Sequence, residues 1–127
     1  PPTKRRRTNS ARLNRARRLR MSPEVLLYYS PNCFGTADAI SYRSGMLRIH
    51  DLKTGEIPAH IEQLMVYAAL FCLEYRVKPE TIKTELRIYQ NDEVLFHNPE
   101  ADELLPVMNK IIELDKVINQ VRNEEEG

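Results

Sequence analysis

The sequence predicts an α/β domain, and the spacing of its apolar residues carries that prediction. Residues 24–30, 36–42, 47–53, 84–90 and 93–97 have the alternation or the aliphatic and aromatic content of strands. Residues 60–76 and the stretch that begins at Pro99 have apolar residues at helical spacing. The order is three strands, a helix, two strands and a helix. We therefore expect a mixed central sheet of about four to five strands flanked by helices.

Turn and breaker residues separate these elements. Pro31-Asn32, Arg43-Ser44-Gly45 and Asn91-Asp92 are turn signals between consecutive strands. Pro79 should stop the first long helix, and Pro106 is expected to kink or divide the last one. The chain therefore reads as one continuous run of short elements without an internal repeat.

The N-terminal region has a different character from the rest of the chain. Residues 1–8 are expected to be disordered or only locally extended, and Asn9 or Ser10 could cap a helix over residues 11–21. Ser22-Pro23 should end that helix. We therefore divide the chain into a basic arm and helix, residues 1–21, and a single domain, residues 22–127, that ends in a helix.

The net charge of +1 conceals a strong asymmetry between these two parts. Residues 1–20 carry nine basic residues and no acid, namely Lys4, Arg5, Arg6, Arg7, Arg12, Arg15, Arg17, Arg18 and Arg20. The remaining residues carry ten basic and eighteen acidic side chains, which leaves them at −8. A cationic segment of this density is a natural counterion for phosphate, so we expect sequence-independent contacts to the DNA backbone. A solvated tail is the alternative.

Other classes of protein are disfavoured by composition. The longest apolar run, residues 64–73, is too short to span a bilayer, and no apolar segment of a secretory signal follows the basic N-terminus. Cys33 and Cys72 do not make a disulfide framework and are expected to pack as small hydrophobic residues in a reducing interior. We therefore expect a cytoplasmic protein without a membrane partner.

The stretch from Gly35 to Tyr67 holds polar side chains where a core is expected. Asp51 and Lys53 continue the alternation of Leu47 and Ile49, so all four side chains should lie on one face of a strand. The short link at residues 43–45 would bring Asp38 opposite this strand. On the helix that follows, Gln63 and Tyr67 are four residues apart and share one flank.

This pattern predicts a site for a divalent cation. Two neighbouring carboxylates repel each other unless they are protonated or bridged by a cation, and burial increases the cost. Oxygen ligands favour Mg²⁺ or Mn²⁺, whereas a zinc site would need more His or Cys. Lys53 could hold a water or an attacked phosphate, which fits phosphodiester hydrolysis. The alternative is an ordinary ion pair at the end of the sheet, with Asp38 capping a turn.

Three short motifs in this order resemble those of the PD-(D/E)xK nuclease superfamily, in its RecB-like and phage recombination exonuclease branch. The motifs are GTAD at residues 35–38, DLK at residues 51–53 and QLMVY at residues 63–67. The resemblance covers roughly residues 24–90. It implies a restriction-endonuclease-like core, metal ligation by Asp38, Asp51 and the carbonyl of Leu52, and a role for Lys53 in orienting water. It also implies that Gln63 and Tyr67 support the site and approach the DNA backbone.

The sequence departs from this family at several positions. Ala37 stands where the motif has proline, and the upstream helix lacks the acid or histidine that many relatives carry there. Glu24 is the nearest upstream carboxylate, but it lies in an expected strand. An iron-sulfur cluster needs four cysteines, and this chain has two. The resemblance therefore implies a Mg²⁺- or Mn²⁺-dependent deoxyribonuclease, an exonuclease of DNA recombination or repair, without such a cluster. It also implies that the protein acts in the cytoplasm of a bacterium or a phage-infected host cell.

Several residues have simpler interpretations. His50 is expected on the strand face opposite Asp51 as a packed or surface histidine, His60 at the start of the helix as a solvent-exposed one, and His97 apart from the site. Glu85 and Arg87 are expected to form a surface pair. Two rival functions stay open: a DNA-binding or assembly module that keeps the nuclease scaffold without turnover, and a purely structural interaction domain. The apolar stripe of the last helix is either core or a contact between copies in a homo-oligomer.

Overall fold

A computed structural model describes residues 4–7, 21–56 and 58–126 of the chain. The strands are β1 (Lys4–Arg7), β2 (Ser22–Ser30), β3 (Cys33–Arg43), β4 (Met46–Leu52), β5 (Lys83–Gln90) and β6 (Glu93–His97). The helices are α2 (Ile61–Tyr75), the short 3₁₀ helix η1 (Pro79–Thr81) and α3 (Ala101–Glu126). The protein is therefore of the mixed α/β class, as the sequence predicts.

The strands form one mixed sheet in the order β1-β6-β5-β4-β3-β2. All neighbouring pairs are antiparallel except β4 and β5, which are parallel. A parallel pair needs a crossover connection, and α2 supplies it. The carboxyl end of β4 and the amino end of α2 therefore follow each other closely in the chain.

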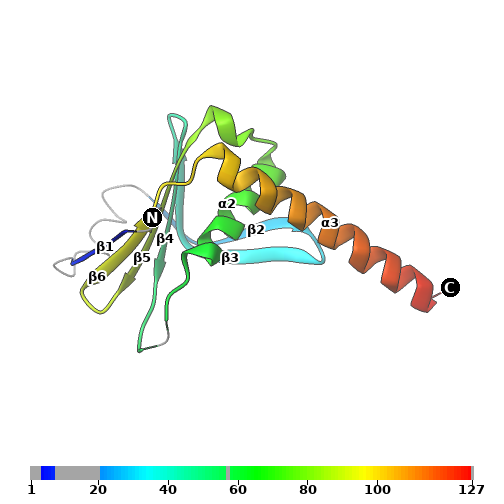
Figure 1. The fold of residues 1–127 in the computed structure, drawn as a ribbon, viewed down its shortest axis with the longest axis horizontal. Helices are drawn as coiled ribbons and strands as arrows, with labels where there is room; N and C mark the ends of the chain where they lie inside the picture. The colour runs from blue at the N-terminus through cyan, green and yellow to red at the C-terminus, as the bar shows by residue number, and fades with distance from the viewer. Residues whose placement is uncertain (1–3, 8–20, 57, 127) are drawn as a thin grey trace.

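The main core lies between the sheet and α2. Leu47 and Ile49 of β4 are fully buried, and so are Leu64 and Ala68 of α2. Both helices lie on the same side of the sheet, with α3 against α2 (Figure 1). Within the described residues the sheet is thus covered by helices on one face, where the sequence led us to expect helices flanking it.

The apolar stripe of the C-terminal helix belongs only in part to the core. Leu104 and Ile111 are buried in the core, whereas Leu114, Val117 and Val121 are about half exposed. The C-terminal part of α3 extends beyond the sheet (Figure 1). The helix runs through Pro106 without a division, because one missing N–H near its start is offset by packing on either side.

The N-terminal region differs in part from the expectation. Lys4–Arg7 form the edge strand β1, paired with β6 in the register Lys4↔Phe96 to Arg7↔Glu93, rather than a disordered or merely extended segment. This strand brings the sheet to six strands, whereas four to five were expected. The helix expected over residues 11–21 lies outside the described residues, except for Met21.

Replacing Leu64 of α2 by Ala should strongly destabilise the fold. The side chain is fully buried between the helix and the sheet, so its loss removes apolar contact and leaves a cavity. We expect a loss of about 2–5 kcal/mol in the free energy of unfolding, measured by urea denaturation. Val66→Ala, on the exposed side of the same helix, is the matched control and should cost far less. Equal losses in the two variants would contradict the assigned core.

Candidate functional site

Asp51 and Lys53 lie together at the carboxyl end of β4. Alternation places the Asp51 side chain on the core face with Leu47 and Ile49, and the residue is 7% exposed. The backbone N–H of Lys53 donates to the carbonyl of Tyr89 at 2.9 Å, which extends the parallel pairing of β4 and β5 by one residue. This bond fixes the Lys53 backbone, and its ammonium nitrogen lies 3.1 Å from Oδ2 of Asp51.

Asp38 reaches the same point from β3. The backbone N–H of Leu52 donates a hydrogen bond to Oδ2 of Asp38 at 2.9 Å. The two carboxyl groups are close enough to hydrogen-bond with each other, which shifts the pKa of both. The side chain of Asp38 is therefore held beside Asp51 and beside the backbone of Leu52.

Gln63 and Tyr67 of α2 complete the cluster. The Lys53 ammonium group donates to Oε1 of Gln63 at 3.3 Å, and Nε2 of Gln63 donates to the Tyr67 hydroxyl at 2.9 Å. The four-residue spacing on one helix brings Gln63 and Tyr67 into contact, as expected. The structure thus brings together all six residues predicted for the site, Asp38, Asp51, Leu52, Lys53, Gln63 and Tyr67.

The two carboxyl groups have opposite shifts in pKa. Burial, with the neighbouring Asp38, raises the pKa of Asp51 to about 6, against the opposing effect of Lys53. Hydrogen bonding to Asp51 lowers the pKa of Asp38, helped by the Leu52 N–H and by Lys53. Burial is also the main cause of the raised pKa of Tyr67. A pair of carboxyl groups whose pKa values are driven apart is typical of functional sites.

A divalent cation fits this pair. Oδ2 of Asp51 is buried and accepts no well-directed hydrogen bond, although Lys53 lies within ion-pair distance. Asp38 is exposed, but the buried carboxylate of Asp51 lies beside it, and a cation bound between the two would offset both the burial and the repulsion.

The donor set is small. Among the described residues, no three or more His, Cys, Asp or Glu side chains come together as a metal-binding group. Glu24 falls opposite Asp38 in the register of β2 and β3, at an irregular residue with a φ of 50°, but its exposed side chain does not join the pair. Two carboxylates and a backbone carbonyl suit Mg²⁺, which keeps several waters in its coordination shell.

Of the nine predicted DNA-binding residues, the structure places four. Lys4, Arg5, Arg6 and Arg7 form β1 at the edge of the sheet, three strands away from β4. Adjacent strands are about 4.8 Å apart, so this edge is on the order of 14 Å from the carboxylates. The other five, Arg12, Arg15, Arg17, Arg18 and Arg20, lie outside the described residues.

The opposite face of β4 and β5 carries a separate polar network. His50 is buried and lies 2.9 Å from Glu85, and Arg48 and Arg87 approach the same carboxylate at 3.4 and 3.3 Å. Burial acts to raise the pKa of Glu85, but its cationic neighbours prevail and lower it. The expected pair of Glu85 and Arg87 therefore forms, but its expected position on the surface was wrong, because the charges are largely covered and share several partners.

The other histidines follow the simpler interpretations. His97 is buried and lies 2.8 Å from Glu103 of α3. It belongs to β6, which β5 separates from the strands that carry the carboxylates. His60 precedes α2 and is exposed. Both cysteines are free and buried, and burial raises the pKa of Cys72 to about 11.

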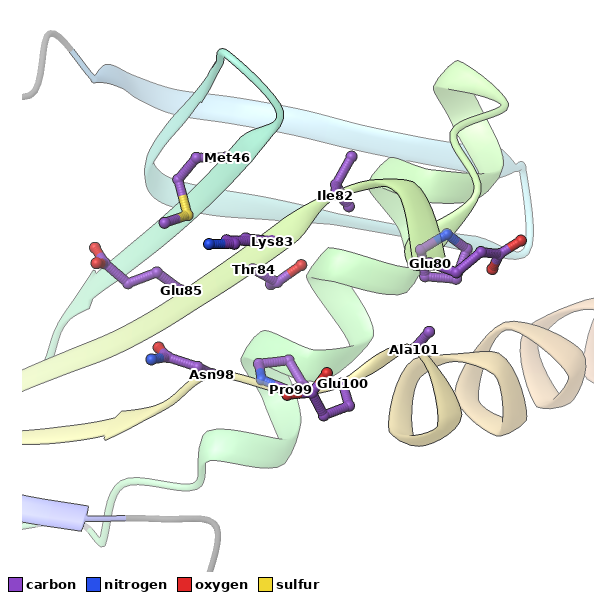
Figure 2. A pocket seen from close by; sticks show the side chains of 11 residues that line it. Met46, Glu80, Ile82, Lys83, Thr84, Glu85, Asn98, Pro99, Glu100 and Ala101 are labelled. Atoms are coloured by element: carbon purple, nitrogen blue, oxygen red, sulfur yellow. The ribbon is translucent and has the colours of Figure 1, made fainter.

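A cavity of about 430 Å³ lies elsewhere in the molecule (Figure 2). Its lining includes Met46, Lys83, Thr84 and Glu85, near the start of β4 and β5, and Pro99 before α3. The candidate site is at the other end of β4. The residues of the candidate site do not line this cavity.

One contributor to the site could not be read from the sequence. The carbonyl of Tyr89 anchors the Lys53 backbone, but this bond depends on the parallel register in which Leu52 faces Tyr89. Residues 52 and 89 are far apart in the chain, and no local pattern encodes their pairing.

Comparisons of the chain with family models, with curated proteins and with solved structures give no match. In the described part of the chain, neither helix has the length and apolar character needed to cross a membrane.

Proposed function

We propose that this protein is a metal-dependent nuclease that hydrolyses phosphodiester bonds of DNA. The observation that carries the proposal is the convergence of Asp38, Asp51 and Lys53 at one end of the central strands. The proposal extends to a restriction-endonuclease-like core and to membership of the PD-(D/E)xK superfamily, in its RecB-like and phage-type exonuclease branch. The β3-β4-α2-β5 unit and the positions of the three motifs within it support that extension.

In this proposal the carboxylates of Asp38 and Asp51 and the carbonyl of Leu52 hold Mg²⁺ or Mn²⁺. When bound, such an ion supplies Lewis acidity and neutralises charge that develops on the phosphate. Oxygen donors only, and a buried carboxylate oxygen without a hydrogen bond, support this choice of ion.

In this proposal Lys53 orients the reacting groups and stabilises the transition state. Its ammonium group has three N–H donors, and in the described part of the chain Asp51 and Gln63 occupy two directions. The remaining donor can hold the attacking water or a phosphate oxygen in line with the scissile bond. A fixed positive charge at that point stabilises the transition state more than the ground state.

The decisive experiment compares linear with circular DNA in the presence of Mg²⁺, Mn²⁺ or EDTA. We expect cleavage with either ion and none with EDTA. Loss of linear DNA alone would identify an exonuclease, and nicking or linearisation of circles would identify an endonuclease. Protein that binds DNA but cuts neither substrate with any divalent ion would overturn the proposal in favour of an inactive DNA-binding module.

The basic arm, residues 1–20, should supply affinity without sequence preference. We expect removal of its charge to weaken DNA binding strongly in 50 mM salt and little in 300 mM salt, since the contribution comes from released counterions. If all nine charges engage duplex DNA, the slope of log K against log salt is about −8. Fluorescence anisotropy over a salt series measures it.

A second variant separates charge from structure. Changing Arg12, Arg15, Arg17, Arg18 and Arg20 together to Gln leaves the paired strand β1 intact. The slope should shrink by about 4–5 in this variant, one counterion for each lost contact. An unchanged slope would show that these five residues do not contact DNA.

A further inference from the structure

Gly35 of β3 is required by a neighbouring side chain and not by its own backbone. Among the glycines in the described residues, Gly45 and Gly55 have φ values of 74° and 80°, and open space surrounds the position of a Cβ. Gly35 has no positive φ. Instead, a Cβ at position 35 would lie 2.7 Å from Cε1 and 3.3 Å from Cδ1 of Tyr67. The ring of Tyr67 thus occupies the space that any side chain at position 35 would need.

The Tyr67 ring is the far end of a chain of contacts that leads to Lys53. Its hydroxyl accepts a hydrogen bond from Gln63, whose side-chain oxygen accepts one from the Lys53 ammonium group. Tyr67 lies on α2 between the buried residues Leu64 and Ala68. Because these two residues are packed in the core, the helix has little freedom to move. The position of the phenol therefore depends on the surface of β3 at Gly35.

We propose that Gly35 is a positioning residue for the candidate active site. By leaving room for the Tyr67 ring, it keeps the phenol in place to hold Gln63, and Gln63 in turn holds the Lys53 ammonium group beside Asp51. The expected effect on kcat rests on the proposed nuclease function. The expected effect on the position of the Tyr67 ring does not. Gly35 joins the site as a residue without a side chain, three positions before Asp38 on the same strand.

Gly35→Ala should displace the reacting groups without removing any of them. Ordinary contact between carbon atoms needs about 3.5–4.0 Å, so the ring must move by about 1 Å. A displacement of that size breaks the 2.9 Å hydrogen bond to Gln63. We expect kcat for Mn²⁺-dependent cleavage to fall by about 10–100-fold, with KM for DNA within about two-fold of wild type. Thr36→Ala, at the exposed neighbouring position, is the matched control and should keep full activity.

A double-mutant cycle with Tyr67→Ala tests the mechanism. In the Tyr67→Ala background the ring is gone, so Gly35→Ala should change kcat by less than about two-fold and should no longer lower the melting temperature. The same loss of kcat in both backgrounds would overturn the inference, and so would a fully active Gly35→Ala variant. Because the double variant relieves the clash, poor folding of Gly35→Ala alone does not prevent the test.

An activity-independent measurement distinguishes this inference from the nuclease proposal. The pKa of Tyr67 is raised, chiefly by burial, and NMR of ¹³Cζ-labelled tyrosine can follow it, with Tyr67→Phe to assign the signal. In Gly35→Ala the displaced phenol should lose the hydrogen bond from Gln63, which lowers the pKa of Tyr67 in the wild type, so this pKa should rise further. An unchanged titration would overturn the role of Gly35. Wild-type protein that never cuts DNA would overturn the nuclease proposal while leaving this titration to decide the role of Gly35.

Discussion

Asp51→Asn is expected to abolish metal-dependent cleavage and, without metal at pH 8, to raise the melting temperature of the protein. The carboxylate is buried beside a second carboxylate, and one of its oxygens has no well-directed hydrogen bond. Asn keeps the shape, carries no charge and can donate to Asp38. Lys53 loses its partner, but its side chain is one-third exposed and can be hydrated. Activity and stability should therefore change in opposite directions.

The pH dependence of this stabilisation follows from the shifted pKa. In the folded protein the pKa of Asp51 is about 6, raised from an ordinary value of 3.8. Because the folded value is the higher one, the contribution of Asp51 to stability is complete below pH 3.8 and is lost as the pH rises through about 6. The lowered pKa of Asp38 acts in the opposite direction. We expect a net difference on the order of 1–2 kcal/mol between variant and wild type above pH 7, and almost none at pH 4.

Thermal denaturation from pH 4 to pH 8 measures this difference, with a rise of about 5 °C expected for Asp51→Asn at pH 8. Addition of Mn²⁺ should raise the melting temperature of the wild type and not that of the variant, since only the wild type gains a bound ion. Asp92→Asn, in an exposed turn, is the matched control and should behave as wild type. A variant less stable than wild type at pH 8 would show that Asp51 is there as a structural ion pair.

The local part of this site was predictable from the sequence because short-range geometry determines it. Alternation alone places Asp51 beside Leu47 and Ile49, and a four-residue spacing alone joins Gln63 to Tyr67. The turn at residues 43–45 is short enough to bring β3 against β4, as expected. These relations need no knowledge of the rest of the fold.

Relations between distant segments were not predictable in the same way. The exposed surface pair expected for Glu85 and Arg87 is instead a covered network, because β4 lies parallel to β5 and delivers Arg48 and His50 to the same carboxylate. The pairing of Lys4–Arg7 with β6 likewise joins the first strand of the chain to the last one. Charge density predicts contacts with phosphate, but it does not show that the backbone of such a segment can complete a sheet edge.

Lys53→Ala should cause a loss of cleavage similar to that of Asp51→Asn while changing stability in the other direction. Removing one preorganised donor from a site of this kind costs at least about 100-fold in kcat. The Asp51 carboxylate then stays buried beside Asp38 without its cation, so the pKa of Asp51 should rise further and the protein should be less stable at pH 8 than wild type. DNA affinity should stay within a few-fold, because the arm of residues 1–20 keeps its nine basic residues, which no acid in that segment offsets.

Two further variants sharpen this result. Lys116→Ala removes an equal charge from an exposed position on α3 and should keep full activity. Lys53→Arg keeps the charge and should restore stability at pH 8, but a planar guanidinium cannot place a single donor between Asp51 and Gln63 as the ammonium does, so cleavage should stay low. If Lys53→Ala kept activity close to that of wild type, other groups would have to orient the water and stabilise the charge of the transition state. We expect cleavage to be lost in both Lys53→Ala and Asp51→Asn, while their stabilities change in opposite directions. That result would show that the buried Asp51 carboxylate destabilises the fold and is needed for the proposed reaction.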